Sequence, residues 1–146
     1  MTPRERVTGI GGIFFKSPDP RALQQWYQEH LGVPADADGY VAFAWRELHD
    51  PERTGLTTWS AFAESTTYFA QSRREFMVNY RVESLDRMLA QLRAAGVAVD
   101  DATEDTPYGR FGWATDPDGT RIELWEPPVA RPPAAGGTSE GDASGA

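Results

Sequence analysis

The sequence contains no cysteine, and only two of its 146 residues are histidine. A chain without cysteine forms no disulfide and offers no thiolate ligand to a metal, as is common in reducing compartments. The N-terminus lacks the apolar core of a signal peptide, and no apolar run is long enough to cross a bilayer. These absences predict a cytoplasmic protein with no membrane partner.

Basic residues are also few. The 14 lysines and arginines are outnumbered by 22 aspartates and glutamates, which gives a formal net charge of -8. Nucleic acid would be repelled by such a surface, so we expect no nucleic-acid partner. The chain has the length of one domain and 40% hydrophobic residues, as in globular proteins. Its acidic balance suits a small cationic or zwitterionic molecule better.

Turn and capping residues divide the chain into two halves with similar elements. In the first half, an apolar strand over residues 9–16 is followed by a helix that Asp19 caps and Gly32 ends. The apolar residues of this helix recur at helical spacing, which gives it one buried face. Strands over residues 40–46 and 56–62 complete the half.

The second half begins after residues 63–74, where the pattern allows either a loop or a short helical turn. A strand over residues 75–82 alternates in polarity. Ser84 then caps a second helix, Gly96 ends it, and a strand over residues 97–103 follows. The order of elements therefore repeats that of the first half.

The chain closes with a hairpin of strands over residues 110–115 and 120–125, joined by an Asp-Pro-Asp-Gly turn. Side chains alternate along a strand, so Ile122 and Leu124 share one face and should pack under a helix. The opposite face carries Arg121, Glu123 and Trp125. There Glu123 must line a wet pocket, meet a cation or remain a solvated strand residue.

The two halves resemble copies of one module. The stretch FAWRELHDPERTG (residues 43–55) corresponds to FGWATDPDG (residues 111–119), and a nearly constant spacing separates Gly12 from Met77 and Gly32 from Gly96. Such self-similarity indicates duplication. Each half is too small to bury its own sheet face, so we predict that the halves pair and enclose a cup. A cup between related modules is a typical site for a small molecule.

Three motifs carry a resemblance to a known family: GGIFFKSPDPRALQQWYQEHLGV, FMVNYRVESLDRMLAQLRAAGV and YGRFGWATDPDGTRIELWEPP. Together they resemble the vicinal oxygen chelate (VOC) superfamily, which includes glyoxalase I, bleomycin-resistance proteins and extradiol dioxygenases. The resemblance implies an α+β fold in which two tandem βαβββ modules form an open, cup-like mixed sheet. It also implies that the chain forms a homodimer, as these proteins often do.

The domain is expected to cover residues 9–128, with its modules at about residues 9–64 and 75–128. Residues 1–8 are polar and are predicted to form a flexible N-terminus. Residues 129–146 consist almost entirely of proline, alanine, glycine, serine, threonine and acids, a composition that predicts a disordered tail.

Enzymes of this superfamily typically hold a divalent metal with side chains from four strands. By the resemblance, the four metal-binding positions correspond here to Gly12, to a residue at or next to Trp59, to Met77 and to Glu123. Of these residue types only the glutamate is a competent ligand for such an ion. Surface or helix-packing roles are favoured for His30 and His49. We therefore predict no catalytic metal and no other cofactor.

Glu123 is the candidate catalytic residue, as a general base or as the anchor for a cationic group. Apolar walls from Trp59 and Trp125 would raise its pKa, and Arg121 on the same face would lower it. In the alternative interpretation, Glu123 pairs with Arg121 or Arg81 and only neutralises the floor of the cup. The sequence leaves both open.

Further residues are candidates for ligand binding. Asn79 would orient a ligand or satisfy a backbone group, and turn packing is the favoured role of Tyr108. Aromatic side chains could stack a flat molecule, although most will form the core. The full set comprises Phe14, Trp59, Met77, Asn79, Tyr108, Arg121 and Trp125.

Two functions fit this pattern. The first is binding of a small aromatic or cationic molecule in the cup without a catalytic metal, as in the bleomycin-resistance type. The alternative is a metal-dependent lyase, isomerase or dioxygenase of the glyoxalase type that uses Glu123. Its other ligands would then lie one residue out of the assumed register, which moves side chains to the other face of a strand. The sequence leaves open whether the chain is an enzyme.

Overall fold

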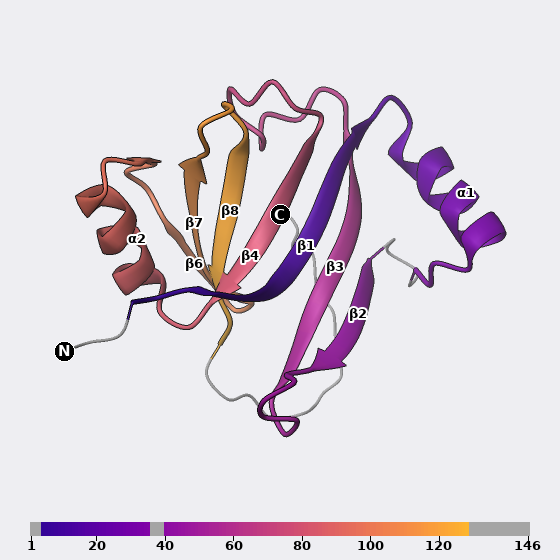
Figure 1. The fold of residues 1–146 in the computed structure, drawn as a ribbon. Helices are drawn as coiled ribbons and strands as arrows, with labels where there is room; N and C mark the ends of the chain where they lie inside the picture. The colour runs from indigo at the N-terminus through magenta and orange to yellow at the C-terminus, as the bar shows by residue number, and fades with distance from the viewer. Residues whose placement is uncertain (1–3, 36–39, 129–146) are drawn as a thin grey trace.

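The computed structural model describes residues 4–35 and 40–128, and Figure 1 shows their arrangement. The elements are β1 (Val7–Ser17), α1 (Pro20–Leu31), β2 (Val41–Arg46), β3 (Thr54–Ala63), β4 (Phe76–Val82), α2 (Leu85–Ala94), β5 (Ala98–Val99), β6 (Glu104–Thr106), β7 (Gly109–Thr115) and β8 (Arg121–Glu126). In the described chain the strands form one sheet, ordered β2-β3-β1-β4-β8-β7-β5, with β6 paired to β7. The N-terminal residues 1–3 and the predicted tail at 129–146 lie outside the described residues.

The sheet joins two similar halves. In each half the first strand pairs in parallel with the last, β1 with β3 and β4 with β8. The two first strands, β1 and β4, pair antiparallel at the centre of the sheet. The predicted α+β fold with an open mixed sheet is confirmed. No helix in the described ranges is long and apolar enough to cross a membrane.

Both helices begin and end with the predicted chemistry. The Asp19 side chain accepts a hydrogen bond from the backbone N–H of Ala22, and the Ser84 hydroxyl accepts one from that of Arg87. These bonds satisfy N–H groups that have no partner within the helix. Gly32, which follows α1, has a φ of 68°, in the left-handed region that glycine tolerates best.

Both helices pack on one face of the sheet. Tyr27 of α1 lies against Trp59 of β3, with ring centroids 4.8 Å apart. Leu124 and Ile122 of β8 pack with the buried leucines of α2, as predicted. Residues paired across neighbouring strands share a face of the sheet. Trp59 pairs with Ile13, and Ile13 pairs with Val78. Tyr80, two residues after Val78 and therefore on the same face, pairs with Leu124, so both helix contacts lie on one side. We call the opposite side the helix-free face.

Several boundaries differ from those expected. Strand β1 begins at Val7 rather than residue 9, and Glu5 pairs with Arg87 of α2 at 2.9 Å. Strand β5 covers two residues of the expected 97–103, and β6 forms where a loop was predicted. Such short edge strands depend on pairing with β7, which local sequence does not reveal.

Residues 64–75 connect β3 to β4 at the top of Figure 1 and fold onto the helix-free face. Phe69 of this segment is fully buried and packs with Phe14, Met77 and Trp113. The segment whose structure the sequence left open therefore completes a hydrophobic core on this face.

Candidate functional site

Glu123 lies in the middle of β8 on the helix-free face and is 1% exposed. Its neighbours across the sheet are Asn79 on β4 and Trp113 on β7. The Asn79 Nδ2 atom donates a hydrogen bond of 2.6 Å to Glu123 Oε2, and the Trp113 Nε1 atom donates one of 3.0 Å to Oε1. Both flanking strands therefore supply a donor to the carboxylate.

A third donor comes from the 64–75 segment. The Tyr68 hydroxyl donates a hydrogen bond to Glu123 Oε1. The Tyr68 ring stacks on Phe62 at 5.6 Å and meets Trp113 edge-on at 6.1 Å. Tyr68 could not be selected from the sequence, because its segment shows neither the alternation of a strand nor the apolar spacing of a helix. The only signal was the pair of adjacent aromatics in TTYFA.

Burial and hydrogen bonding act on the Glu123 carboxyl in opposite directions. Burial raises its pKa, and the bonds from Tyr68, Asn79 and Trp113 together with the charge of Arg121 oppose this; the net direction is upward. Burial and the nearby Glu123 charge also raise the pKa of Tyr68, so the phenol keeps its proton and acts as a donor. Burial thus raises the pKa of both the carboxyl and the phenol, while the hydrogen bonds hold the Glu123 oxygens as acceptors.

This shift gives a testable pH dependence. The folded chain holds a proton on Glu123 more readily than the unfolded chain, where the pKa is near 4.5. The stabilisation from Glu123 is then fully present below 4.5 and is lost as pH rises through the higher folded pKa. We expect the free energy of unfolding of the wild type, relative to that of Glu123→Gln, to fall as pH rises from below 4.5 towards neutrality. Urea unfolding across this range checks it, and a relative stability that rises with pH would contradict it.

The prediction that Trp59 forms a wall beside Glu123 is wrong. Trp59 lies on the helix side of β3, where it contacts Phe15 and Tyr27. Its neighbour Thr58 is the residue that lies opposite Gly12 on the helix-free face. The strand is therefore one residue out of the assumed register, and alternation moves the indole to the other side.

Phe14 and Met77 do lie on the helix-free face, but they are buried in the core that Phe69 completes. Met77 is fully buried, and Phe14 packs against Phe62 with centroids 5.4 Å apart. The half of this face nearest the 64–75 segment is therefore packed.

The arginines pair with carboxylates other than Glu123. In the described chain Arg121 Nη1 lies 2.6 Å from Asp100 Oδ2, and its guanidinium lies 5.1 Å from the centre of the Trp113 ring. Arg81 Nη2 lies 2.6 Å from Glu47 Oε2 and lowers the pKa of that carboxyl. The interpretation in which either arginine pairs directly with Glu123 is wrong. Arg121 acts on Glu123 only as a nearby charge.

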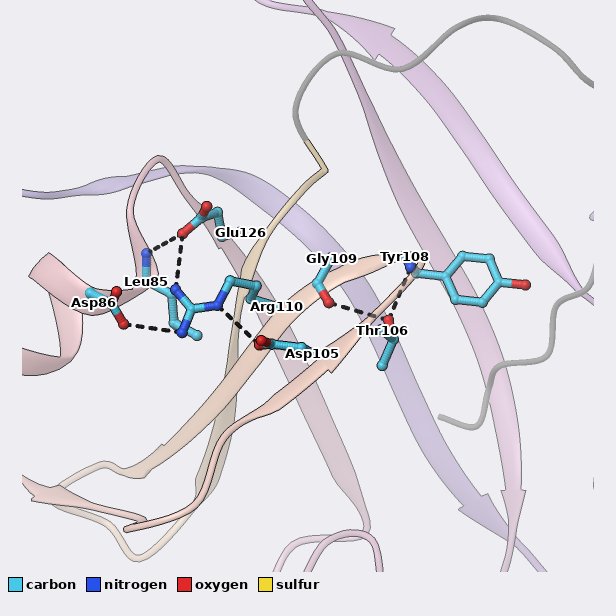
Figure 2. A network of polar contacts seen from close by, with 8 residues as sticks. All are labelled: Leu85, Asp86, Asp105, Thr106, Tyr108, Gly109, Arg110 and Glu126. Carbon is cyan, nitrogen blue, oxygen red and sulfur yellow. Dashed lines mark hydrogen bonds and ion pairs between the residues drawn. The ribbon is translucent and has the colours of Figure 1, made fainter.

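Tyr108 and Trp125 meet at the other end of the helix-free face. The Trp125 Nε1 atom donates a hydrogen bond of 2.8 Å to the backbone oxygen of Tyr108. The Tyr108 N–H donates to Thr106 Oγ1 at 3.0 Å, and its ring points away from the neighbouring ion-pair cluster (Figure 2). In that cluster Arg110 binds three carboxylates, those of Asp86, Asp105 and Glu126. Tyr108 is thus held in an ordered turn, and the residue is 39% exposed.

The residues present do not fit a divalent metal. Among the described residues no group of three histidine, cysteine, aspartate or glutamate side chains could hold one. Gly12 has no side chain, and both oxygens of Glu123 already accept hydrogen bonds. His30 lies against Trp26 on α1, and His49 is exposed in the turn after β2. Neither imidazole adjoins Glu123.

The paired modules and the single sheet define a fold of the VOC type. Residues 12–125 match the model of the glyoxalase-like domain family. The chain belongs to this family, and the predicted membership of the VOC superfamily is confirmed. No curated protein gives a significant match to the sequence.

Solved structures show the same fold at low sequence identity. Methylmalonyl-CoA epimerase from Mycobacterium tuberculosis superposes with a TM-score of 0.60 and 21% identity, over 88% of this chain and 93% of that chain. A Streptomyces coelicolor methylmalonyl-CoA epimerase variant in complex with 2-nitronate-propionyl-CoA gives 0.61 and 16%, over 86% and 100%. NAD-dependent benzaldehyde dehydrogenase from Legionella pneumophila gives 0.54 and 15%, over 80% and 98%. These structures carry different functional names, so their similarity to this chain is one of fold alone.

Proposed function

We propose that the chain binds a small aromatic molecule on its helix-free face and uses no catalytic metal. The observation that carries this proposal is the state of Glu123. Its two oxygens accept three hydrogen bonds from within the chain, and Tyr68 covers it. A carboxylate in this position is a structural acceptor, because a ligand or metal would have to displace buried donors.

The aromatic character of the ligand is supported by the other half of the helix-free face. Trp125 lies on this face and Trp45 lies with its ring 5.3 Å from the Arg81 guanidinium, and both indoles keep part of their surface exposed. Indole rings bind flat molecules through their faces at a low cost in conformational entropy. A cationic ligand is less favoured, because Arg81 lies beside the same surface and both oxygens of Glu123 already accept hydrogen bonds.

The metal-dependent alternative predicts a different composition of the purified protein. We expect elemental analysis to find less than about 0.1 equivalent of Zn, Ni, Fe or Mn per chain, because a single hydrogen-bonded carboxylate is a weak site. The same preparation should show ligand-dependent stabilisation in a thermal-shift screen of small aromatics, including antibiotics and CoA thioesters such as methylmalonyl-CoA, which one of the epimerase structures contains. A stoichiometric metal with turnover of any of these compounds would favour the enzyme.

Homodimer formation and a cytoplasmic location remain predictions of the sequence and of the family resemblance. Glu123 remains a candidate catalytic residue only under the metal-dependent alternative.

A further inference from the structure

The Trp45 indole lies against two glycines. Trp45 belongs to β2, but its indole extends over β3 to reach β1, where it rests on Gly9. A Cβ atom added at Gly9 would fall 2.5 Å from the Trp45 ring, and one added at Gly55 would also overlap it. The Trp45 Nε1 atom donates to Thr57 Oγ1 at 2.8 Å, which fixes the ring in this position. Trp45 aligns with Trp113 in the sequence repeat, but no local pattern marks it as a site residue.

Trp125 approaches the same strand from the opposite side. It belongs to β8, and its indole extends over β4 towards Gly11. A Cβ atom at Gly11 would fall 2.8 Å from Trp125 Cε3. Two indoles from opposite directions therefore converge on the glycines of β1. We call this arrangement the glycine slot, formed by Gly9, Gly11, Trp45 and Trp125.

Two buried polar atoms beneath the slot have no partner. Asn79 and Arg81, two residues apart on β4, are 3% and 4% exposed. Asn79 Oδ1 and Arg81 Nη1 make no hydrogen bond within residues 4–35 and 40–128. The Asn79 amide nitrogen donates to Glu123 Oε2, and the amide oxygen lies against Gly11. Buried polar groups are normally satisfied, so an unmet acceptor and an unmet donor on the same face of β4 indicate a missing partner.

We propose that the glycine slot binds a planar ligand whose edge carries a hydrogen-bond donor next to an acceptor, as in a lactam or a cyclic amide. The donor would bond to Asn79 Oδ1 and the acceptor would bond to Arg81 Nη1. The ring of the ligand would stack on the exposed parts of Trp45 and Trp125. This inference rests on the proposed function and adds the class of ligand and its place on the helix-free face.

Two matched probes test the polar edge. Quinolin-2(1H)-one carries an N–H next to a carbonyl, and 1-methylquinolin-2-one has the same rings and carbonyl but no N–H. We expect the first to bind at least about tenfold more tightly, because its analogue leaves Asn79 Oδ1 buried and unpaired. Tryptophan fluorescence titration of the full chain gives both dissociation constants. Equal affinities for the two probes would overturn the inference about the polar edge.

Two glycine variants test the location. Gly11→Ala places a methyl group against Asn79 and Trp125 and should weaken both probes by at least about tenfold. Gly112→Ala makes the same change on β7, where the added methyl group meets leucines of α2, and should leave both affinities unchanged. If Gly11→Ala does not fold, Arg81→Lys serves instead, since it keeps a cation for Glu47 but removes the Nη1 donor. It should weaken both probes several-fold.

The outcomes separate the two proposals. Binding that persists unchanged in a folded Gly11→Ala, or in Arg81→Lys where it is used instead, overturns the slot as the site. Binding of aromatics in the thermal-shift screen without a preference for the lactam overturns the ligand class but leaves the proposed function standing. If no aromatic compound binds at all, both proposals are overturned.

Discussion

Replacing Glu123 by alanine should lower the free energy of unfolding by about 3–5 kcal/mol, because several buried donors lose their shared acceptor at once. The substitution leaves three donors, on Tyr68, Asn79 and Trp113, without their acceptor. Each unmet buried donor costs about 1–3 kcal/mol, although the cavity admits water and makes the sum smaller. The loss should also release Tyr68, so amide hydrogen exchange within residues 64–75 should become faster.

Urea unfolding measures the first effect, and hydrogen exchange followed by mass spectrometry measures the second. Glu29→Ala is the control, because Glu29 is exposed on α1 and its replacement should change stability by less than about 0.5 kcal/mol. A loss below about 1 kcal/mol for Glu123→Ala would mean that the carboxylate does not hold the three donors.

The parts of the fold that depend on local chemistry were predictable from the sequence. Asp19 and Ser84 cap their helices as expected. A capping side chain accepts a hydrogen bond from a backbone N–H only two or three residues further on, so local sequence is enough to predict it. Ile122 and Leu124 pack under α2, because alternation along a strand is a property of the backbone itself. The repeat predicted the pairing of two similar halves, since neither half can bury its sheet face alone.

The residues that form the site were less predictable, because they depend on strand register and on a segment without regular secondary structure. Strand β1 has an irregularity between Ile10 and Gly12, where its pairing with β4 shifts. An extra residue of this kind changes which side chains of β1 face the site, and no local pattern locates it. The predicted position of Trp59 was wrong for a related reason. A shift of one residue in strand register moves each side chain to the other face of the sheet.

The contacts of the 64–75 segment lay beyond sequence reasoning for another reason. Tyr68 and Phe69 are adjacent in sequence, yet one bonds to β8 and the other enters the core beside β1 and β4. These contacts are tertiary, and nothing in the local sequence encodes them. As a consequence, the segment fills half of the helix-free face. Any ligand on that face is therefore directed towards the half that holds the glycine slot.

Truncation of Phe69 should lower the free energy of unfolding as much as loss of Glu123 does, because it removes buried apolar contacts. Phe69 is fully buried, meets Phe62 edge-on at 5.5 Å and carries the Lys16 ammonium 5.3 Å from its ring centre. Phe69→Ala should lower the free energy of unfolding by about 3–5 kcal/mol, from lost burial and from the cavity that remains. Leu48→Ala is the matched control, since Leu48 is 86% exposed and should cost less than about 0.5 kcal/mol.

Glu123 and Phe69 hold the same segment, so their effects should not add. Once Glu123→Ala has released Tyr68, the chain around Phe69 is already loosened and has less stability to lose. In urea unfolding, the double variant should be more stable than the sum of the single losses predicts, by about 1 kcal/mol or more, as for residues that share one packed unit. Strict additivity would show that Tyr68 and Phe69 hold the segment independently. In that case the carboxylate would not control access to the packed half of the helix-free face.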